Sequence, residues 1–535
     1  MADFGALNWS ILAIYLIANI YLGFALSKRV ETAEDFYVGR RNTPWWAIGI
    51  SVVATYVSAL SFLGGPAWVY TESMAVIAIH MNYPLVILIV ITFFLPFFYN
   101  SGVASIYEYQ EKRFGPASRS VMSGIFLISQ ALTSAAILYA TSLVIQFITG
   151  IDVVTAIVIV SVIALIYTMM GGIAAVIWTD VIQAGVLLIG AMIILYAIIT
   201  ELPMPVAELL STLESTGKTQ TLDWSFDFTK EATIWSGVIA MTLFHTTVYG
   251  ANQMMVQRTL AAKNIGDAKK SFLMMGYVAF FIYFLFMFLG LLFYGYYEGR
   301  EFENGNTIIL QFAADYGLPG LMGVIAAAVI AASMSSLDSS LNSMATVSTL
   351  DFYQRYFKPN EDSKHYLVVS RWFTLVWAAA IVVPAILYSR SEGSILQTLS
   401  QVGAYFVGAK LSMYGLGFFS KQATEKGVLV GVFVGFVVIW WVATQTDIAW
   451  PWYCLIGGVV NIVVSLVASR LIDGPQEEYS PYTIRGQQKM FAESGQAESE
   501  DGWYILPGKV DKQAYGLIVF FFVSCGLLYA FQELA

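Results

Sequence analysis

Apolar stretches close to 20 residues long follow one another along the chain, and they constrain its fold more than any other feature. About 20 helical residues cross the hydrocarbon core of a bilayer, so each stretch predicts a membrane-spanning helix. Only 12% of the residues are charged and 58% are hydrophobic, roughly half the charged share of a soluble domain. The predicted fold class is therefore all-α and polytopic. The predicted spans, about fourteen, are residues 7–27, 44–71, 75–99, 120–148, 153–171, 178–200, 232–255, 271–296, 319–348, 366–388, 394–418, 425–444, 450–469 and 514–533.

The lysines and arginines divide unequally between the two sets of loops that these spans create. With the loop after the first span placed in the cytoplasm, the outer loops hold only Lys218, Lys230, Arg300 and Arg390. Cytoplasmic loops are the ones enriched in basic residues, so this assignment predicts the orientation of the chain. An even number of spans then puts both termini on the extracytoplasmic side of a plasma membrane, and we expect a bacterial inner membrane.

The ninth apolar stretch contains a dense group of oxygen-bearing side chains. Ser335, Ser336, Asp338, Ser339 and Ser340 fall within two helical turns. Such polar groups are costly inside a membrane unless the protein uses them. Hydroxyl and carboxylate oxygens are the ligands of small hard cations. The pattern therefore indicates a cation-coupled membrane transporter.

Two predicted spans carry signs of an interrupted helix. The second mixes polar residues with apolar ones and then reads Gly64-Gly65-Pro66, and the seventh places His245 and Gly250 near its middle. Backbone unwinds at membrane depth only where it faces protein or water. Paired broken helices mark the binding site in transporters built from inverted repeats. Because the two spans lie five helices apart, they predict such a repeat.

The sequence lacks the signatures of an enzyme. It contains no GxSxG turn, no HExxH helix and no phosphate-cradling loop, so we predict that the chain is not an enzyme. Cys454 and Cys525 both fall in apolar runs, which indicates neither a disulfide framework nor thiol chemistry. A solute sensor or channel on the same fold remains a remote alternative to a transporter.

Six strings occur in order between about residues 35 and 440: DFYVGRRNTPWWAIG, YEYQEKRFG, GGIAAVIWTDVIQ, NQMMVQRTLAAK, SSLDSSLNSMATVSTLDFY and KGVLVGVF. With them the chain resembles the sodium/solute symporter family, which includes the sodium–galactose and sodium–sialic acid symporters. The resemblance implies a core of five plus five helices in inverted repeat, with the first and sixth core helices broken. The expected division is an extra helix (1–34), the core (35–418, with halves of about 44–200 and 232–418), two extra helices (419–470), a cytoplasmic polar segment (471–512) and a C-terminal helix (513–535). We expect the polar segment to be a flexible connection.

The resemblance also implies a principal sodium site between the first broken helix and the eighth core helix. Its ligands would be the backbone carbonyls of Ala54, Val57 and Ala332 and the hydroxyls of Ser335 and Ser336. An unwound turn frees carbonyls, and facing hydroxyls can complete an oxygen cage. The alternative is that the two serines only let helices pack closely, as small residues do in membranes.

A second sodium site of some relatives would fall on Asp180, Ser335, Asp338 and Ser339. Asp180 has an alternative interpretation as a carboxylate that caps a helix N-terminus at the membrane interface. Asp338 departs from the family pattern of Ser or Thr. It can bind an ion, pair with Lys410, which is the only lysine away from the ends of the predicted spans, or be protonated because burial disfavours its charge.

The substrate pocket implied by sugar-transporting relatives would use Ser61, His80, Tyr83, Thr133, His245, Ser400 and Gln401, with Asn82 adjacent. Two of the chain's three histidines are among them, although a lone membrane histidine can simply bond a neighbouring helix. Thr133 stands where the sialic acid relative has an arginine. Imidazole, amide and hydroxyl groups suit a polyhydroxyl compound, and imidazolium can also meet a weak acid.

The function predicted is sodium-coupled symport of a small polar organic solute by alternating access, with one or two sodium ions as coupling ions. A sugar or a sugar-derived compound is the expected solute. A small carboxylate or an amino acid is the alternative. The expected partners are the solute, sodium ions and the lipid bilayer, with no nucleic acid, and the oligomeric state is left open.

Overall fold

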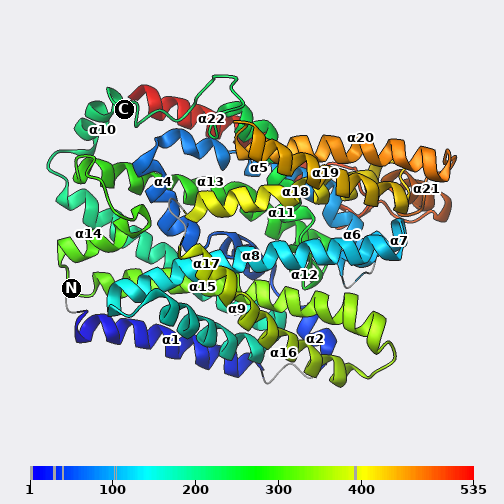
Figure 1. Cartoon of the computed structure of the whole chain (residues 1–535), viewed down its shortest axis with the longest axis horizontal. Helices are drawn as coiled ribbons and strands as arrows, with labels where there is room; N and C mark the ends of the chain where they lie inside the picture. The colour runs from blue at the N-terminus through cyan, green and yellow to red at the C-terminus, as the bar shows by residue number, and fades with distance from the viewer. Residues whose placement is uncertain are drawn as a thin grey trace.

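The computed structural model describes residues 4–27, 32–38, 41–101, 103, 105–390 and 395–534. Most of its long helices run along the longest axis of the molecule (Figure 1). The helices α1, α2 and α16 lie along one edge, α19, α20 and α22 lie toward the opposite edge, and α8, α9 and α15 lie between them (Figure 1). Both described termini lie at the end that also holds α10 and α14 (Figure 1). Which side of the membrane this end faces remains a prediction.

The α-helices are α1 (Gly5–Ser27), α2 (Ala33–Val38), α3 (Trp45–Tyr56), α4 (Gly65–Thr71), α5 (Tyr83–Ile89), α6 (Leu95–Ser101), α7 (Ile106–Arg113), α8 (Pro116–Thr149), α9 (Val153–Glu201), α10 (Val206–Glu214), α11 (Met241–Gly250), α12 (Gln253–Leu260), α13 (Ile265–Tyr296), α14 (Ile308–Tyr316), α15 (Leu321–Val347), α16 (Ser363–Ala380), α17 (Val382–Tyr388), α18 (Ile395–Phe419), α19 (Glu425–Gln445), α20 (Tyr453–Asp473), α21 (Ile484–Ser494) and α22 (Tyr515–Leu534). The 3-10 and π segments are η1 (Leu60–Gly64), η2 (Met74–Ile79), η3 (Val90–Phe94), η4 (Ser236–Ala240), η5 (Gly305–Thr307), η6 (Ser348–Phe357), η7 (Trp450–Trp452) and η8 (Lys512–Ala514). The strands β1 (Ser499–Glu500) and β2 (Trp503–Tyr504) form an antiparallel ribbon.

Among the described residues, ten helices are long and apolar enough to cross a membrane, and a bent pair raises the number to eleven. The predicted spans 153–171 and 178–200 both fall in α9, which consists of two helices that meet at a kink. This helix changes direction at Gly172, where φ is +57° and a Cβ would lie 2.9 Å from the Cα of Phe36. The structure thus confirms a helical membrane protein, whereas the count of fourteen remains a prediction.

Both helices that the sequence predicts to be interrupted are interrupted. The second span consists of α3 and a continuation through η1 and α4, bent by 56° at a break that begins at Val57. The seventh consists of η4 and α11, then Ala251 and Asn252, and then α12, whose first turn Asn252 caps by accepting from the N–H of Met254. The inverted-repeat relation between the two halves remains a prediction.

The segment 471–512 is packed against the bundle, which corrects the expectation of a flexible connection. A buried ion pair joins Asp511 to Lys269 of α13 at 2.6 Å, and both side chains are fully buried. The backbone N–H of Gly508 donates to the carbonyl of Thr92, and Trp503 is 6% exposed. Low sequence complexity predicts a flexible connection, but the contacts of a few residues are enough to hold this segment against the bundle.

We expect Lys269→Met to destabilise the protein, because Asp511 would keep a buried charge without its partner. Breaking such a pair costs about 3–5 kcal/mol. The midpoint of thermal unfolding in detergent should fall, and Asp511→Asn added to the first change should recover part of the loss. Lys489→Met is the control, since the Lys489–Glu493 pair is 3.8 Å long and largely exposed. Equal effects of Lys269→Met and Lys489→Met would contradict this role of the ion pair.

Candidate functional site

The break that ends α3 leaves backbone carbonyls without helical partners, and side chains from other helices bond them. The last carbonyls of any helix lack partners within it. Ser335 of α15 donates to the carbonyl of Ala54 at 3.0 Å, and Ser336 donates to that of Thr55 at 2.8 Å. The same two hydroxyls also lie 2.9 Å and 3.4 Å from the carbonyl of Ala332. Five oxygens from two helices therefore meet at one buried point.

This oxygen cluster contains four of the five groups predicted for the principal sodium site: those of Ala54, Ala332, Ser335 and Ser336. Val57 follows as the C-cap of α3, and none of these hydrogen bonds includes its carbonyl. A serine hydroxyl can rotate its proton away and offer a lone pair. The oxygens that hydrogen-bond here are therefore suited to hold a hard cation.

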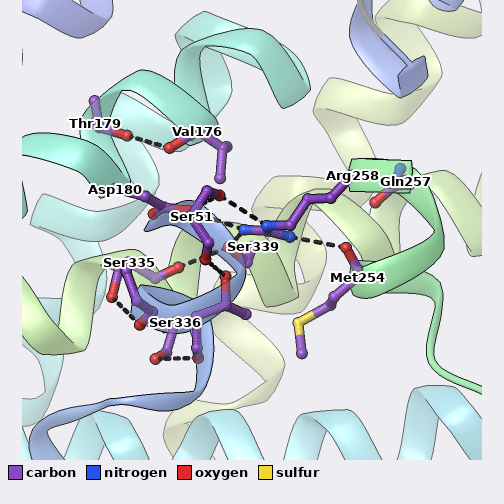
Figure 2. Close-up of polar contacts among 12 residues, drawn as sticks. Ser51, Val176, Thr179, Asp180, Met254, Gln257, Arg258, Ser335, Ser336 and Ser339 are labelled. Carbon is purple, nitrogen blue, oxygen red and sulfur yellow. Dashed lines mark hydrogen bonds and ion pairs between the residues drawn. The ribbon is translucent and has the colours of Figure 1, made fainter. Parts of the chain in front are cut away.

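A buried arginine, Arg258 of α12, holds the neighbouring helices together. Its guanidinium lies 2.9 Å from the carboxylate of Asp180 in α9, and both side chains have no exposed surface. It also donates to the hydroxyl of Ser339 at 2.6 Å, to that of Ser51 at 2.8 Å and to the carbonyl of Met254 at 2.8 Å. Figure 2 shows these groups converging from four helices on one guanidinium.

This arrangement corrects one interpretation of Asp180 and bears on the predicted second sodium site. Asp180 lies inside α9, fully buried, and is not a cap at the membrane interface. Arg258 bridges Asp180 and Ser339, two of the four residues predicted for that site. Asp338 accepts from Thr168 of α9 at 2.6 Å. The second sodium site remains a prediction.

Lys410 of α18 is directed away from its predicted partner Asp338. Its ammonium donates to the hydroxyl of Ser129 in α8 at 3.0 Å, whereas the carboxylate of Asp338 faces Thr168. Lys410 also lines a cavity for which the sequence predicts no lysine.

A cavity of about 170 Å³ adjoins the oxygen cluster. Six of the seven residues predicted for the pocket line it: Ser61, His80, Tyr83, Thr133, His245 and Ser400. Gln401, the seventh, is exposed and does not line it. Thr55 and Ser336 line the cavity as well, so the oxygen cluster and the pocket share a wall.

Hydrogen bonds fix the orientation of His245 in this pocket. The amide nitrogen of Asn82 donates to the carbonyls of Ile79 and Gly237, which leaves its oxygen facing Nδ1 of His245 at 2.8 Å. Nδ1 must then carry the proton, and Nε2 is an acceptor. The ring of His80 stacks on Tyr283 at 3.8 Å between centroids. The pocket thus offers a solute an oriented acceptor and aromatic faces.

Sequence reasoning missed Arg258 and Tyr283. The topology prediction assigns Arg258 to a cytoplasmic loop because it follows an apolar span, and its position in the string QRTLAAK is the available signal. Tyr283 lies in an apolar run, and nothing in its neighbours marks it as part of a pocket.

The model of the sodium:solute symporter family matches residues 36–435. The chain belongs to this family. The sodium/sialic acid symporter SiaT of Proteus mirabilis is 30% identical over 477 residues, which are 88% of this chain and 96% of SiaT. Human sodium-coupled monocarboxylate transporter 1 is 29% identical over 452 residues, 82% of this chain and 73% of the transporter. A solved structure of a substrate-bound, outward-open Na⁺-coupled sialic acid symporter superimposes with a TM-score of 0.81 at 29% identity, covering 89% of this chain and all of that one.

Membership makes this chain a sodium-coupled symporter of the membrane, with sodium as its coupling ion. The proteins it resembles are transporters and not enzymes. The predicted resemblance to sodium/solute symporters is confirmed.

Replacing Arg258 with Met should destabilise this symporter strongly, because Asp180 would keep an uncompensated buried charge at a cost of about 3–5 kcal/mol. The double variant Arg258→Met, Asp180→Leu should recover much of the loss, since it removes both charges. Thermal unfolding in detergent measures the effect, with Lys358→Met in an exposed ion pair as the control. A single variant as stable as the parent would refute the central role of this pair.

Proposed function

We propose that this symporter imports a small, polyhydroxylated organic solute together with sodium by alternating access, and that the solute is a sugar or is derived from one. The main support for the proposal is that the oxygen cluster and the cavity share a wall. Thr55 and Ser336 belong to both. A cation bound there would fix the wall that the solute touches.

Sodium would be held by the carbonyls of Ala54, Val57 and Ala332 and by the hydroxyls of Ser335 and Ser336. Oxygen ligands from α3 and α15 would tie the two helices together, so sodium binding favours one arrangement of the halves. Coupling is reciprocal, and the solute must raise sodium affinity by the factor by which sodium raises solute affinity. Each sodium ion supplies about 2.3 kcal/mol per 100 mV, and a tenfold gradient adds about 1.4 kcal/mol.

A second ion is proposed near Asp180, Ser335, Asp338 and Ser339. One carboxylate oxygen of Asp180, Oδ1, is buried without a hydrogen-bond partner among the described residues. That oxygen is available to a cation even while Oδ2 pairs with Arg258. For the four residues to share an ion, Ser339 must exchange its bond with Arg258 for the cation.

The solute class follows from the pocket and the relatives. Nε2 of His245, the hydroxyls of Ser61, Thr133 and Ser400, and the faces of His80 and Tyr283 suit the hydroxyls and ring of a sugar-like compound. The proteins that this chain is similar to include symporters of sialic acid. A small carboxylate is the second candidate, favoured by the similarity to monocarboxylate transporters. An amino acid has no specific support.

Ser336→Ala should weaken sodium-driven uptake, because it removes one ligand of the ion and one wall group of the pocket. In proteoliposomes with an imposed sodium gradient, we expect the sodium concentration for half-maximal uptake to rise by about tenfold. This rise corresponds to the loss of about 1.4 kcal/mol of sodium-binding free energy from one ligand bond. Ser343→Ala is the matched control, since Ser343 lies on the same helix and donates to Gln257 instead. Unchanged sodium dependence in Ser336→Ala would refute the assignment, and uptake that never exceeds equilibrium would indicate a channel.

A further inference from the structure

The cavity beside the oxygen cluster contains a positive charge for which the described residues provide no anionic partner. Lys410 lines the cavity and is 9% exposed. Its hydrogen-bond partner among the described residues is the hydroxyl of Ser129, at 3.0 Å. None of the described residues that line the cavity is an aspartate or a glutamate. An ammonium at membrane depth is costly unless it meets an anion.

Ser129 holds this ammonium so that donors remain for a ligand. The Ser129 hydroxyl donates its own proton to the carbonyl of Phe126 at 3.1 Å, so it must accept from Lys410. An ammonium has three donors, and this bond uses one. The other two are free to meet a ligand in the cavity that Lys410 lines.

Other polar groups line the cavity together with Lys410. Thr133 lies one turn along α8, where its hydroxyl donates to the carbonyl of Ser129 at 2.9 Å and can offer a ligand an acceptor. Ser400 lines the same cavity from α18. The wall shared with the sodium cluster, at Thr55 and Ser336, borders the cavity too. A ligand there would be placed between a bound sodium ion and an ammonium.

We infer that Lys410 determines the solute specificity of this symporter by binding a carboxylate group of the solute. The inference deepens the proposed function and rests on it. One ammonium with two donors matches the single charge and the oxygens of a carboxylate. A phosphate dianion would carry more negative charge than one lysine neutralises. The rest of the solute then faces His80 and His245.

The test compares acids with their neutral counterparts on the purified protein. The pairs are N-acetylneuraminate with N-acetylmannosamine, galacturonate with galactose, and lactate with lactamide, each with and without sodium. Inorganic phosphate is added as an anion that is not a carboxylate. We expect the parent to bind an acid in a sodium-dependent manner and at least tenfold more tightly than its neutral partner. Phosphate should bind weakly.

Lys410→Met should lower the affinity for that acid by about 10- to 100-fold, because a charged hydrogen bond is lost. The affinity for the neutral partner of that acid should stay unchanged. Lys410→Arg should keep the preference for the acid. Lys421→Met, which removes an exposed charge just beyond α18, is the matched control and should behave like the parent. Sodium-dependent thermal stabilisation of each variant verifies that it is folded.

Three results would overturn the inference: acid binding by Lys410→Met equal to the parent's, a parent that binds the neutral members as tightly as the acids, or no binding of any acid. If Lys410→Met fails to fold, the acid-to-neutral ratio of the parent still decides. Sodium-driven uptake of a neutral sugar alone would overturn the role of Lys410 and leave the proposed function standing. Absence of sodium-driven uptake for every probe would overturn the proposed function itself.

Discussion

The structure depends on one constraint: a helix that ends within the membrane must have its free carbonyls bonded by protein groups. The carbonyls of Ala54 and Thr55 accept from Ser335 and Ser336 of α15. That of Tyr56 is within 3.4 Å of the hydroxyl of Tyr283. Bilayer lipid offers no partners, so the break can exist only where these side chains reach it. The groups that make the break stable are thereby the groups that would surround the proposed cation and solute.

Arg258 holds this junction together. Burying its charge costs free energy, which only several simultaneous contacts can offset. An isolated buried charge is strongly unfavourable, and a buried ion pair is favourable only when further hydrogen bonds satisfy its atoms. Arg258 meets that condition, because its donors reach Asp180, Ser51, Ser339 and a backbone carbonyl. These partners lie on α3, α9, α12 and α15. A shift of α15 relative to α3 must therefore change the oxygen cluster and the arginine contacts together, which links ion binding to helix position.

The sequence predicts the structural features that local composition controls. It does not predict the features that depend on contacts with residues distant in the chain. Apolar length reveals the spans, and the mixed polar character of the second and seventh spans reveals both breaks. Serine spacing on one helix, read with the family resemblance, locates the cluster of Ser335 and Ser336. The burial of Arg258 depends instead on three other helices, and the packing of the segment 471–512 depends on Lys269, which lies more than 200 residues earlier. Likewise, the exposure of Gln401 depends on which face α18 turns to the cavity.

Binding of an acidic solute at Lys410 would also change the free energy available for coupled transport. A neutral solute entering with one sodium ion gains about 3.7 kcal/mol from 100 mV and a tenfold gradient. A monocarboxylate entering with one sodium ion carries no net charge, so only about 1.4 kcal/mol from the gradient remains. With two ions the monocarboxylate gains about 5 kcal/mol. A second ion is thus worth more, in proportion, to a symporter of acids than to a symporter of neutral sugars. In the proposed second site, the carboxylate of Asp338 and the oxygen of Asp180 that does not pair with Arg258 would compensate the charge of such an ion.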